Sequence, residues 1–212
     1  IWNESSFSNT SISYSDQRAD ASFLNYKTSS VTSMANNTLQ SYSVRQINQT
    51  QISNKLGTEY GFEASSKILQ YDFLLNDLAA SQDVSIVNTA VFSTFRYLFA
   101  SKFLISTGAR VERNDYEKKN LISPRLNAKY NLKDGVSALI YNAGSYYQNP
   151  PEIYLSVEEN SSLKSVRTFQ HSLTYERLLT SSTKLTLAYY QKTYSDAPML
   201  SSMLARTEPT FL

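Results

Sequence analysis

Two carboxylates four positions apart, Glu59 and Glu63, are the first residues whose type and spacing could do chemistry. In an extended strand they share one face, where paired carboxylates can exchange protons or hold Ca²⁺. The same spacing is typical of a hydrated sheet face, on which carboxylates pair with cations of neighbouring strands such as Arg110, Arg125 and Lys129. We favour the hydrated face, because nothing else in the sequence completes a catalytic or calcium site.

Nucleophilic and zinc chemistry have little support in the sequence. Cysteine is absent, and His171 in FQHSLTY is the only histidine. A hydrolytic triad would need a serine and a carboxylate that converge on this imidazole. Zinc sites usually take several Cys or His ligands. We therefore expect no catalytic residues, no metal site and no cofactor, and we interpret His171 as part of a wall with Phe169, Leu173 and Tyr175 on its face.

A ligand-binding role fits the segment YYQNPPEIYL at residues 146–155 better than any other. Its tyrosines offer stacking area, its amides offer hydrogen bonds, and two prolines stiffen the backbone. The alternative is a pair of aromatic girdle residues followed by a rigid loop. The ligand candidates are Tyr146, Tyr147, Gln148, Asn149 and Tyr154, with Tyr71 and Phe73 as weaker candidates in an earlier loop.

An alternation with a period of two residues places these candidates on strands. In NLISPRLNAKYNLKDG, at residues 120–135, Ile122 and Leu126 alternate with Ser123, Arg125 and Asn127. Such alternation predicts a strand with two unlike faces. Nine segments show it, each close to the roughly ten residues of a tilted membrane-spanning strand. The expected strands cover residues 6–15, 39–48, 55–66, 85–95, 102–114, 121–132, 136–147, 167–178 and 184–194.

The connections between these strands alternate in length. Short ones near residues 48–53, 96–101, 133–135 and 179–183 alternate with long ones at 16–38, 68–84 and 148–166, the connection at 117–120 being the one brief exception on the long side. Tight turns at one end and long loops at the other are typical of an antiparallel up-and-down transmembrane β-barrel. A soluble Greek-key sandwich also mixes link lengths, but without this alternation. Bacterial barrels have even strand numbers, so nine strands predict an incomplete portion of a larger barrel.

Composition narrows the function classes. The 212 residues carry a net charge of +2 with basic residues spread along the chain, so we expect no nucleic-acid partner. No run approaches the roughly 20 apolar residues of a membrane helix. The start, IWNESSFSNT, lacks the basic and apolar regions of a signal peptide, which we interpret as a mature form or a fragment.

Four motifs in order resemble the TonB-dependent outer-membrane receptors. They are GARVERN at 108–114, ISPRLNAKY at 122–130, YNAGSYYQNPP at 141–151 and LTLAYYQKTYSDAP at 185–198. The resemblance covers about residues 55–200, while residues 1–54 match poorly and no plug domain is visible. It implies a plugged barrel of about 22 strands. The inward-facing residues would then contact the plug, with Arg125 foremost: Glu59, Glu63, Arg110, Glu112, Arg125 and Lys129.

By that resemblance, we expect residues 1–212 to form one β-barrel region in the outer membrane of a Gram-negative-type bacterium. The expected partners are outer-membrane lipid, the protein's own plug domain, a TonB-type energy complex and a small nutrient ligand. Two alternatives stay open. One is a small self-contained barrel of about ten strands, acting as a pore or surface hydrolase, and the other is a soluble β-rich adhesion module.

Overall fold

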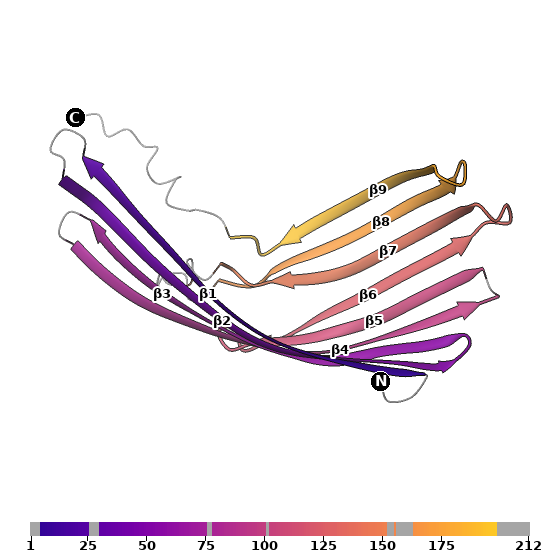
Figure 1. Ribbon diagram of the computed structural model, residues 1–212, viewed down its shortest axis with the longest axis horizontal. Helices are drawn as coiled ribbons and strands as arrows, with labels where there is room; N and C mark the ends of the chain where they lie inside the picture. Colours follow the sequence, from indigo (N-terminus) through magenta and orange to yellow (C-terminus); the bar gives the residue numbers. More distant parts are fainter. Residues whose placement is uncertain are drawn as a thin grey trace.

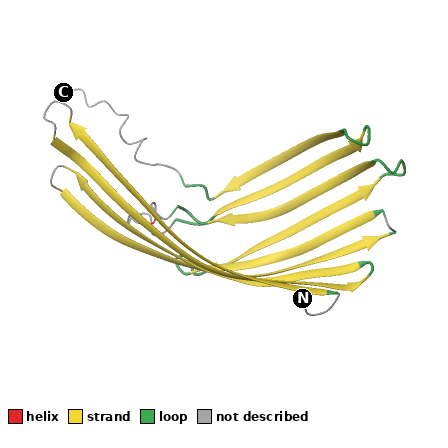
Figure 2. Cartoon of the chain, in the orientation of Figure 1, coloured by secondary structure: helices red, strands yellow, loops and turns green. Residues whose placement is uncertain are grey.

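A single curved antiparallel sheet forms the structure, a computed structural model that describes residues 5–25, 30–75, 78–100, 102–151, 155 and 163–198. Each strand pairs with the next one along the chain (Figures 1 and 2). The nine strands are β1 (Ser6–Asn25), β2 (Ser30–Ser53), β3 (Leu56–Leu75), β4 (Leu78–Phe99), β5 (Phe103–Asn114), β6 (Asn120–Asn131), β7 (Ser137–Gln148), β8 (Val166–Leu178) and β9 (Lys184–Ser195).

The sheet is open within the described part of the chain. β1 and β9 lie at its two edges and do not pair with each other. The predicted count of nine strands and the predicted up-and-down order are therefore confirmed. An open nine-stranded wall also agrees with the expectation of an incomplete portion of a larger barrel. No helix among the described residues has the length and apolarity needed to cross a membrane.

The two faces of the wall differ sharply in chemistry. Pairing carries Phe62, Val91, Val111 and Ile122 across four strands in one row. We call this side the apolar face. The side chain of Ile122 is 57% exposed, whereas its neighbour Ser123 on the opposite side is 1% exposed. We call that opposite side the charged face, because it carries Arg45, Glu63, Arg110 and Glu112.

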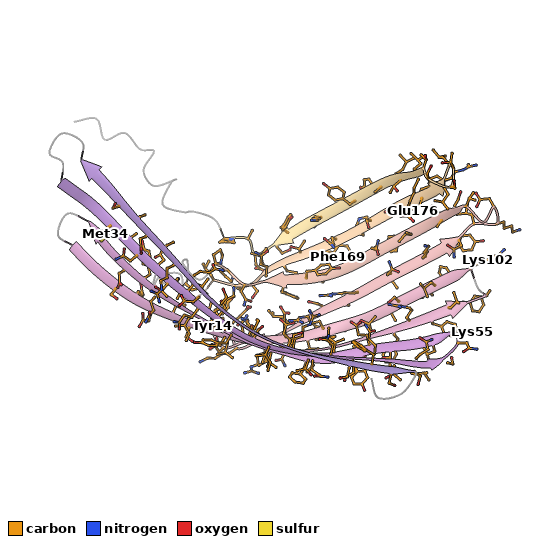
Figure 3. The ribbon with its side chains drawn as sticks, in the orientation of Figure 1. Tyr14, Met34, Lys55, Lys102, Phe169 and Glu176 are labelled. Atoms are coloured by element: carbon orange, nitrogen blue, oxygen red, sulfur yellow. The ribbon has the colours of Figure 1, made fainter. Side chains whose placement is uncertain are left out.

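Large apolar side chains stay exposed on the apolar face of β3, β4 and β6–β9. Figure 3 draws the side chains of the wall. Burying such a side chain contributes roughly 1.5–3 kcal/mol, so a row of them left in water is strongly unfavourable. The charged face offers no second apolar layer to compensate, since few apolar residues of the described part are buried. The exposed members include Tyr60, Phe62, Val91, Phe95, Ile122, Leu126, Leu139, Tyr141, Leu173, Leu187 and Tyr189. Such a wall requires an apolar environment on one side.

The first four strands are longer than the sequence predicted. The expected loops at 16–38 and 68–84 are wrong, because most of these residues extend two hairpins, β1–β2 and β3–β4. Asp16 pairs with Gln40, and Ile68 pairs with Ser85. In Figure 1 these extensions continue beyond the point where β5–β9 end.

Polarity changes sides where the extensions begin, which explains why the sequence pattern failed there. The face that carries Phe62 in the middle of the wall carries Arg18, Thr38, Gln70 and Asp83 in the extensions. Leu39, Leu69 and Val84 lie in register on the opposite face, and Leu69 is only 6% exposed. A search for one continuous amphipathic period ends at this switch. The switch also marks a level at which the environment of the wall changes.

A tight turn joins β6 to β7, as the short connection KDG predicted. The carboxylate of Asp134 accepts hydrogen bonds from the backbone N–H of Ser137 at 2.9 Å and from the Ser137 hydroxyl at 2.6 Å. The Ser137 hydroxyl bond lowers the pKa of Asp134. Gly135 has a φ of 72°, a left-handed conformation that glycine adopts without steric cost.

Candidate functional site

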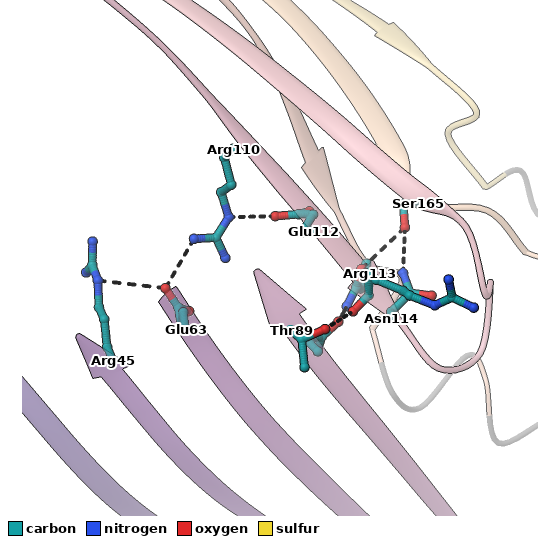
Figure 4. A network of polar contacts seen from close by, with 10 residues as sticks. Arg45, Glu63, Thr89, Arg110, Glu112, Arg113, Asn114 and Ser165 are labelled. Atoms are coloured by element: carbon teal, nitrogen blue, oxygen red, sulfur yellow. Dashed lines mark hydrogen bonds and ion pairs between the residues drawn. The ribbon is translucent and has the colours of Figure 1, made fainter. Parts of the chain in front are cut away.

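Four charged residues form a connected network on the charged face (Figure 4). Arg110 donates from Nε to Glu112 at 2.7 Å and from Nη1 to Glu63 at 3.2 Å. Glu63 also lies 3.8 Å from Nε of Arg45. The side chain of Arg110 is 22% exposed and that of Glu112 is 19% exposed, so solvent screens this pair only partly. Because the network has two cations and two carboxylates, its net charge is zero.

The pairing register of β2 to β5 positions the residues of this network. Arg45, Glu63 and Glu112 belong to three strands but lie in one row across the sheet, with Ala90 of β4 between Glu63 and Glu112. Ala90 is buried and leaves room for Arg110 to reach over β4 toward Glu63. Charged pairs across neighbouring strands stabilise a sheet. The expected pairing of Glu63 with Arg110 is confirmed, although the two residues come from β3 and β5 and not from adjacent strands.

A buried polar cluster ties the ends of the long β7–β8 connection together. Asn114, at the end of β5, donates to Asn149 and to the hydroxyl of Ser165, both at 3.3 Å. Asn149 in turn donates to Asn88 of β4 at 2.7 Å, and Ser165 donates to Glu117 at 2.8 Å. Asn114 and Ser165 are only 2% and 3% exposed. We call these five residues the loop-base cluster.

Tyr116 adds a contact at the same place. Its hydroxyl lies 3.1 Å from the hydroxyl of Ser165. Burial raises the pKa of Tyr116, so the phenol stays protonated at neutral pH and can donate this hydrogen bond. The β5–β6 connection and the β7–β8 connection are thus joined at their bases.

The charge network and the loop base line one pocket of about 420 Å³. The pocket brings three ligand candidates, Tyr147, Gln148 and Asn149, next to three of the predicted inward-facing residues. Amides, carboxylates, a guanidinium and an aromatic ring can together recognise a polar small molecule by hydrogen bonds and stacking. The lining residues are Glu63, Ser65, Lys67, Asn88, Arg110, Glu112, Tyr147, Gln148, Asn149, Pro150 and Pro151.

Tyr146 and Arg125 form a second contact on the charged face. The guanidinium carbon of Arg125 lies 4.9 Å from the centre of the Tyr146 ring, a distance at which cation–π attraction operates. The ring lies across Gly144, where an added Cβ would come within 3.1 Å of the tyrosine oxygen. Tyr146 therefore belongs to the wall rather than to the loop, and β7 continues to Gln148.

The other candidates are separated from this pocket. Glu59 accepts a hydrogen bond from Gln49 at 2.8 Å and lines a different pocket of about 410 Å³ with Arg96, toward the short turns. Lys129 lies on the charged face opposite Leu104 and Ile140.

The two weaker ligand candidates fall outside a loop, and one main candidate falls outside the described residues. Tyr71 and Phe73 were expected in a loop, but they lie within β3, where Tyr71 pairs with Asn37 and Gln82. The loop prediction failed here because the strands extend beyond the polarity switch. Tyr154 lies outside the described residues.

His171 takes the wall position that the sequence predicted. It lies on the apolar face, with Nε2 3.2 Å from Gln191 and ring contacts to Phe169 and Tyr189. Within the described ranges, no group of three or more His, Cys, Asp or Glu residues could hold a metal ion.

The loop-base cluster is what sequence reasoning missed. Asn88, Asn114, Glu117 and Ser165 come from four segments, and no periodicity or motif relates them. One weak signal was present: polar residues at a strand end often satisfy backbone groups, and Asn114 accepts a hydrogen bond from the Glu117 N–H at 2.7 Å.

Replacing Asn114 by alanine should loosen both loop bases. The change leaves the buried groups of Asn149 and Ser165 with fewer partners, which costs about 1–3 kcal/mol locally. Hydrogen exchange of the Glu117 and Ser165 amides, measured in the complete protein that contains this chain, should become faster by one to two orders of magnitude. Asn120→Ala, at the exposed start of β6, is the matched control. Unchanged protection in Asn114→Ala would contradict a linked loop base.

Sequence comparison connects this geometry to a family. Residues 1–208 match the family described as "TonB dependent receptor-like, beta-barrel". The comparison with curated protein sequences finds no match.

Solved structures share the fold. The chain superimposes on a ferric enterobactin receptor mutant from Pseudomonas aeruginosa with a TM-score of 0.75 at 13% identity, covering 90% of this chain and 32% of that one. It superimposes on the copper transporter OprC with a TM-score of 0.76 at 11% identity, covering 91% and 36%. For the alcaligin outer-membrane receptor FauA from Bordetella pertussis the TM-score is 0.57 at 13% identity, with 92% and 41% covered.

The chain thus spans about a third to two fifths of the length of these structures. At such low identity the superpositions support a shared fold alone. The family match, in contrast, extends over nearly the whole chain. This match includes residues 1–54, which showed little resemblance by motif. The family consists of outer-membrane transport receptors rather than enzymes. By this match and by its open antiparallel wall, the chain belongs to the TonB-dependent receptor β-barrel family.

Proposed function

We propose that the chain forms part of the barrel wall of an outer-membrane receptor that imports a small nutrient with TonB-supplied energy. The single observation that carries this proposal is the two-faced wall: an exposed apolar band on one side and a connected charge network on the other. Lipid fits the first face, and a wet lumen fits the second. The family match supports the same arrangement.

The orientation follows from the connections. Short turns at one end of a bacterial barrel face the periplasm, and long loops at the other end face the outside. The extensions of β1–β4 and the loop-base cluster lie at the end that carries the long β7–β8 connection, which we call the long-loop end. We therefore assign the 420 Å³ pocket to the outer part of the lumen, where it would receive ligand from the exterior.

The pocket's chemistry favours a polar ligand without a large net charge. The surrounding network is already neutral, so a strongly charged ligand would gain little from it. Gln148 and Asn149 supply amide groups, and Tyr147 supplies a ring. Closer to the short turns, Glu59, Arg125 and Lys129 lie on the same face and would contact a plug domain.

Nutrient dependence tests this function. The gene for the complete protein is deleted, and growth is compared on a panel of iron chelates, cobalamin and glycans as limiting sources. We expect a defect confined to one source, which the wild-type gene restores. A gene carrying Asn149→Leu and Glu112→Gln should fail to restore growth although the barrel reaches the membrane. Loss of TonB should reproduce the defect. Normal growth of the deletion strain on every source would contradict the import function.

A further inference from the structure

A polar patch interrupts the apolar face at β1 and β2. It consists of Ser6, Ser8, Thr10, Gln46, Asn48 and Thr50, whose side chains bond to one another. Ser8 donates to Asn48 at 2.8 Å, and the Gln46 amide donates to Asn48 at 3.1 Å. Gln46 also bonds to Ser8 and accepts from Thr10, while the hydroxyls of Ser6 and Thr50 lie 3.4 Å apart.

The patch lies at the level of the apolar band and not at its edge. Gln46 shares a row with Phe62, Val91, Val111 and Ile122, and Asn48 shares the next row with Tyr60 and Pro124. Apolar residues also flank it toward the long-loop end, where Ile12 is 82% exposed and Tyr14 contacts Tyr42 at 5.0 Å between ring centres. Two strands thus present amides where their neighbours present mainly apolar side chains, although Ser93 shares the row of Asn48 and Thr58 pairs with Thr50.

Lipid is a poor partner for this patch. A primary amide facing hydrocarbon loses its hydrogen bonds to water and needs protein groups to replace them. The contacts within the patch satisfy Gln46 well. In the part of the chain that the structure describes, however, the Asn48 Nδ2 donates no hydrogen bond, so its two N–H groups have no acceptor there. A protein surface would supply acceptors there.

We propose that the patch is the contact between two copies of the receptor in the membrane. All six side chains are uncharged, and each carries both a donor and an acceptor. A two-fold contact places a surface against itself, so it requires this self-complementarity and excludes like charges. The exposed Ile12, Tyr14 and Tyr42 would add apolar area beside the polar centre. This inference rests on the proposed function in one respect: the apolar face must border lipid.

Cysteine cross-linking in isolated outer membranes tests the contact. The chain contains no cysteine, so a single one can be placed in the complete protein once any cysteines elsewhere are removed. Thr10→Cys lies in the patch. Val91→Cys lies at the same level on β4, and Ser11→Cys lies on the opposite face of β1. With a bismaleimide, Thr10→Cys should give a product of twice the monomer mass, several times more than either control.

A second variant links the dimer to the patch itself. Gln46→Leu combined with Asn48→Leu removes the amides without adding charge. This variant should remain heat-modifiable in detergent, which reports a folded barrel, and should migrate as a monomer in native gels where the wild type migrates as a dimer. If it does not fold, the cross-linking of Thr10→Cys still decides.

Each outcome separates the two proposals. A fluorophore on Val91→Cys that brominated lipid quenches establishes the lipid-facing wall independently of any dimer. With that quenching present, cross-linking of Thr10→Cys no stronger than the controls overturns the dimer and leaves the receptor function standing. A Thr10→Cys product with a different protein also overturns it. Absence of quenching at Val91 would instead overturn the membrane wall and, with it, both proposals.

Discussion

Leu126→Lys should destabilise the complete barrel in lipid vesicles by about 2–4 kcal/mol, the cost of a cation on the lipid face near the bilayer centre. Leu126 lies in the middle of β6 on the apolar face, 38% exposed, with Thr107 and Ala143 beside it in register. In water a lysine at an exposed position changes stability little. The effect therefore depends on lipid, and a urea titration of the barrel in phospholipid vesicles, followed by gel mobility without heating, measures it.

Two matched substitutions on the same strand make this prediction specific. Asn127→Lys places the same cation one residue along, on the charged face, where a wet lumen tolerates it. Tyr130→Lys stays on the apolar face but lies near the turn end of β6, so we expect a cost of about 0–1 kcal/mol at the interface. Equal stability of all three variants would rule out a lipid-facing side for β6.

Arg110→Ala should give the second largest loss, about 1–3 kcal/mol. Arg110 is the centre of the charge network, and its removal leaves the partly buried carboxylates of Glu63 and Glu112 facing each other without a bridging cation. Arg45 still lies 3.8 Å from Glu63, but it does not connect Glu63 to Glu112. Loss of the guanidinium should also weaken retention of the nutrient in the pocket, since Arg110 lines it.

A mutant cycle isolates the network from a general effect of truncation. Arg110→Lys keeps the charge but lacks the two-pronged geometry that contacts both carboxylates, so its loss should be smaller than that of alanine. Combining Arg110→Ala with Glu112→Gln removes one of the stranded charges and should recover part of the stability. If the double variant is as unstable as the sum of the single variants, Arg110 and Glu112 act independently and the network account is wrong.

Much of the wall could be predicted because apolar and polar residues alternate along a strand whose two faces meet different environments. β6 shows this best: Ile122 and Leu126 are exposed on one face, and Ser123 is buried on the other, as alternation predicted. Strand number and order followed from the same pattern, and the incomplete barrel followed from the odd number of strands. The pairing of Glu63 with Arg110 could also be anticipated, since both are charged residues on the polar side of their strands, but the reach across β4 could not.

The remaining features depend on contacts that leave no local pattern. A single amphipathic period does not predict the extensions of β1–β4, because the apolar side changes from Phe62's face to Leu69's face partway along β3. The loop-base cluster joins Asn88 to Asn149 across 61 positions, a contact set by the path of the chain rather than by spacing. The polar patch looked unremarkable in sequence, because serine, threonine, asparagine and glutamine are common throughout this chain. Its position within the apolar face follows only from the register of Gln46 with Phe62 and Val91.

The central claim is that this chain is a barrel wall with lipid on one face and lumen on the other. A cysteine series along β6 in the complete protein tests it most directly, with a fluorophore at each position from 121 to 131 and brominated phospholipid as quencher. We expect quenching that alternates residue by residue, strong at Ile122, Leu126 and Tyr130 and weak at Ser123, Asn127 and Lys129. Uniform quenching, or none, would contradict it.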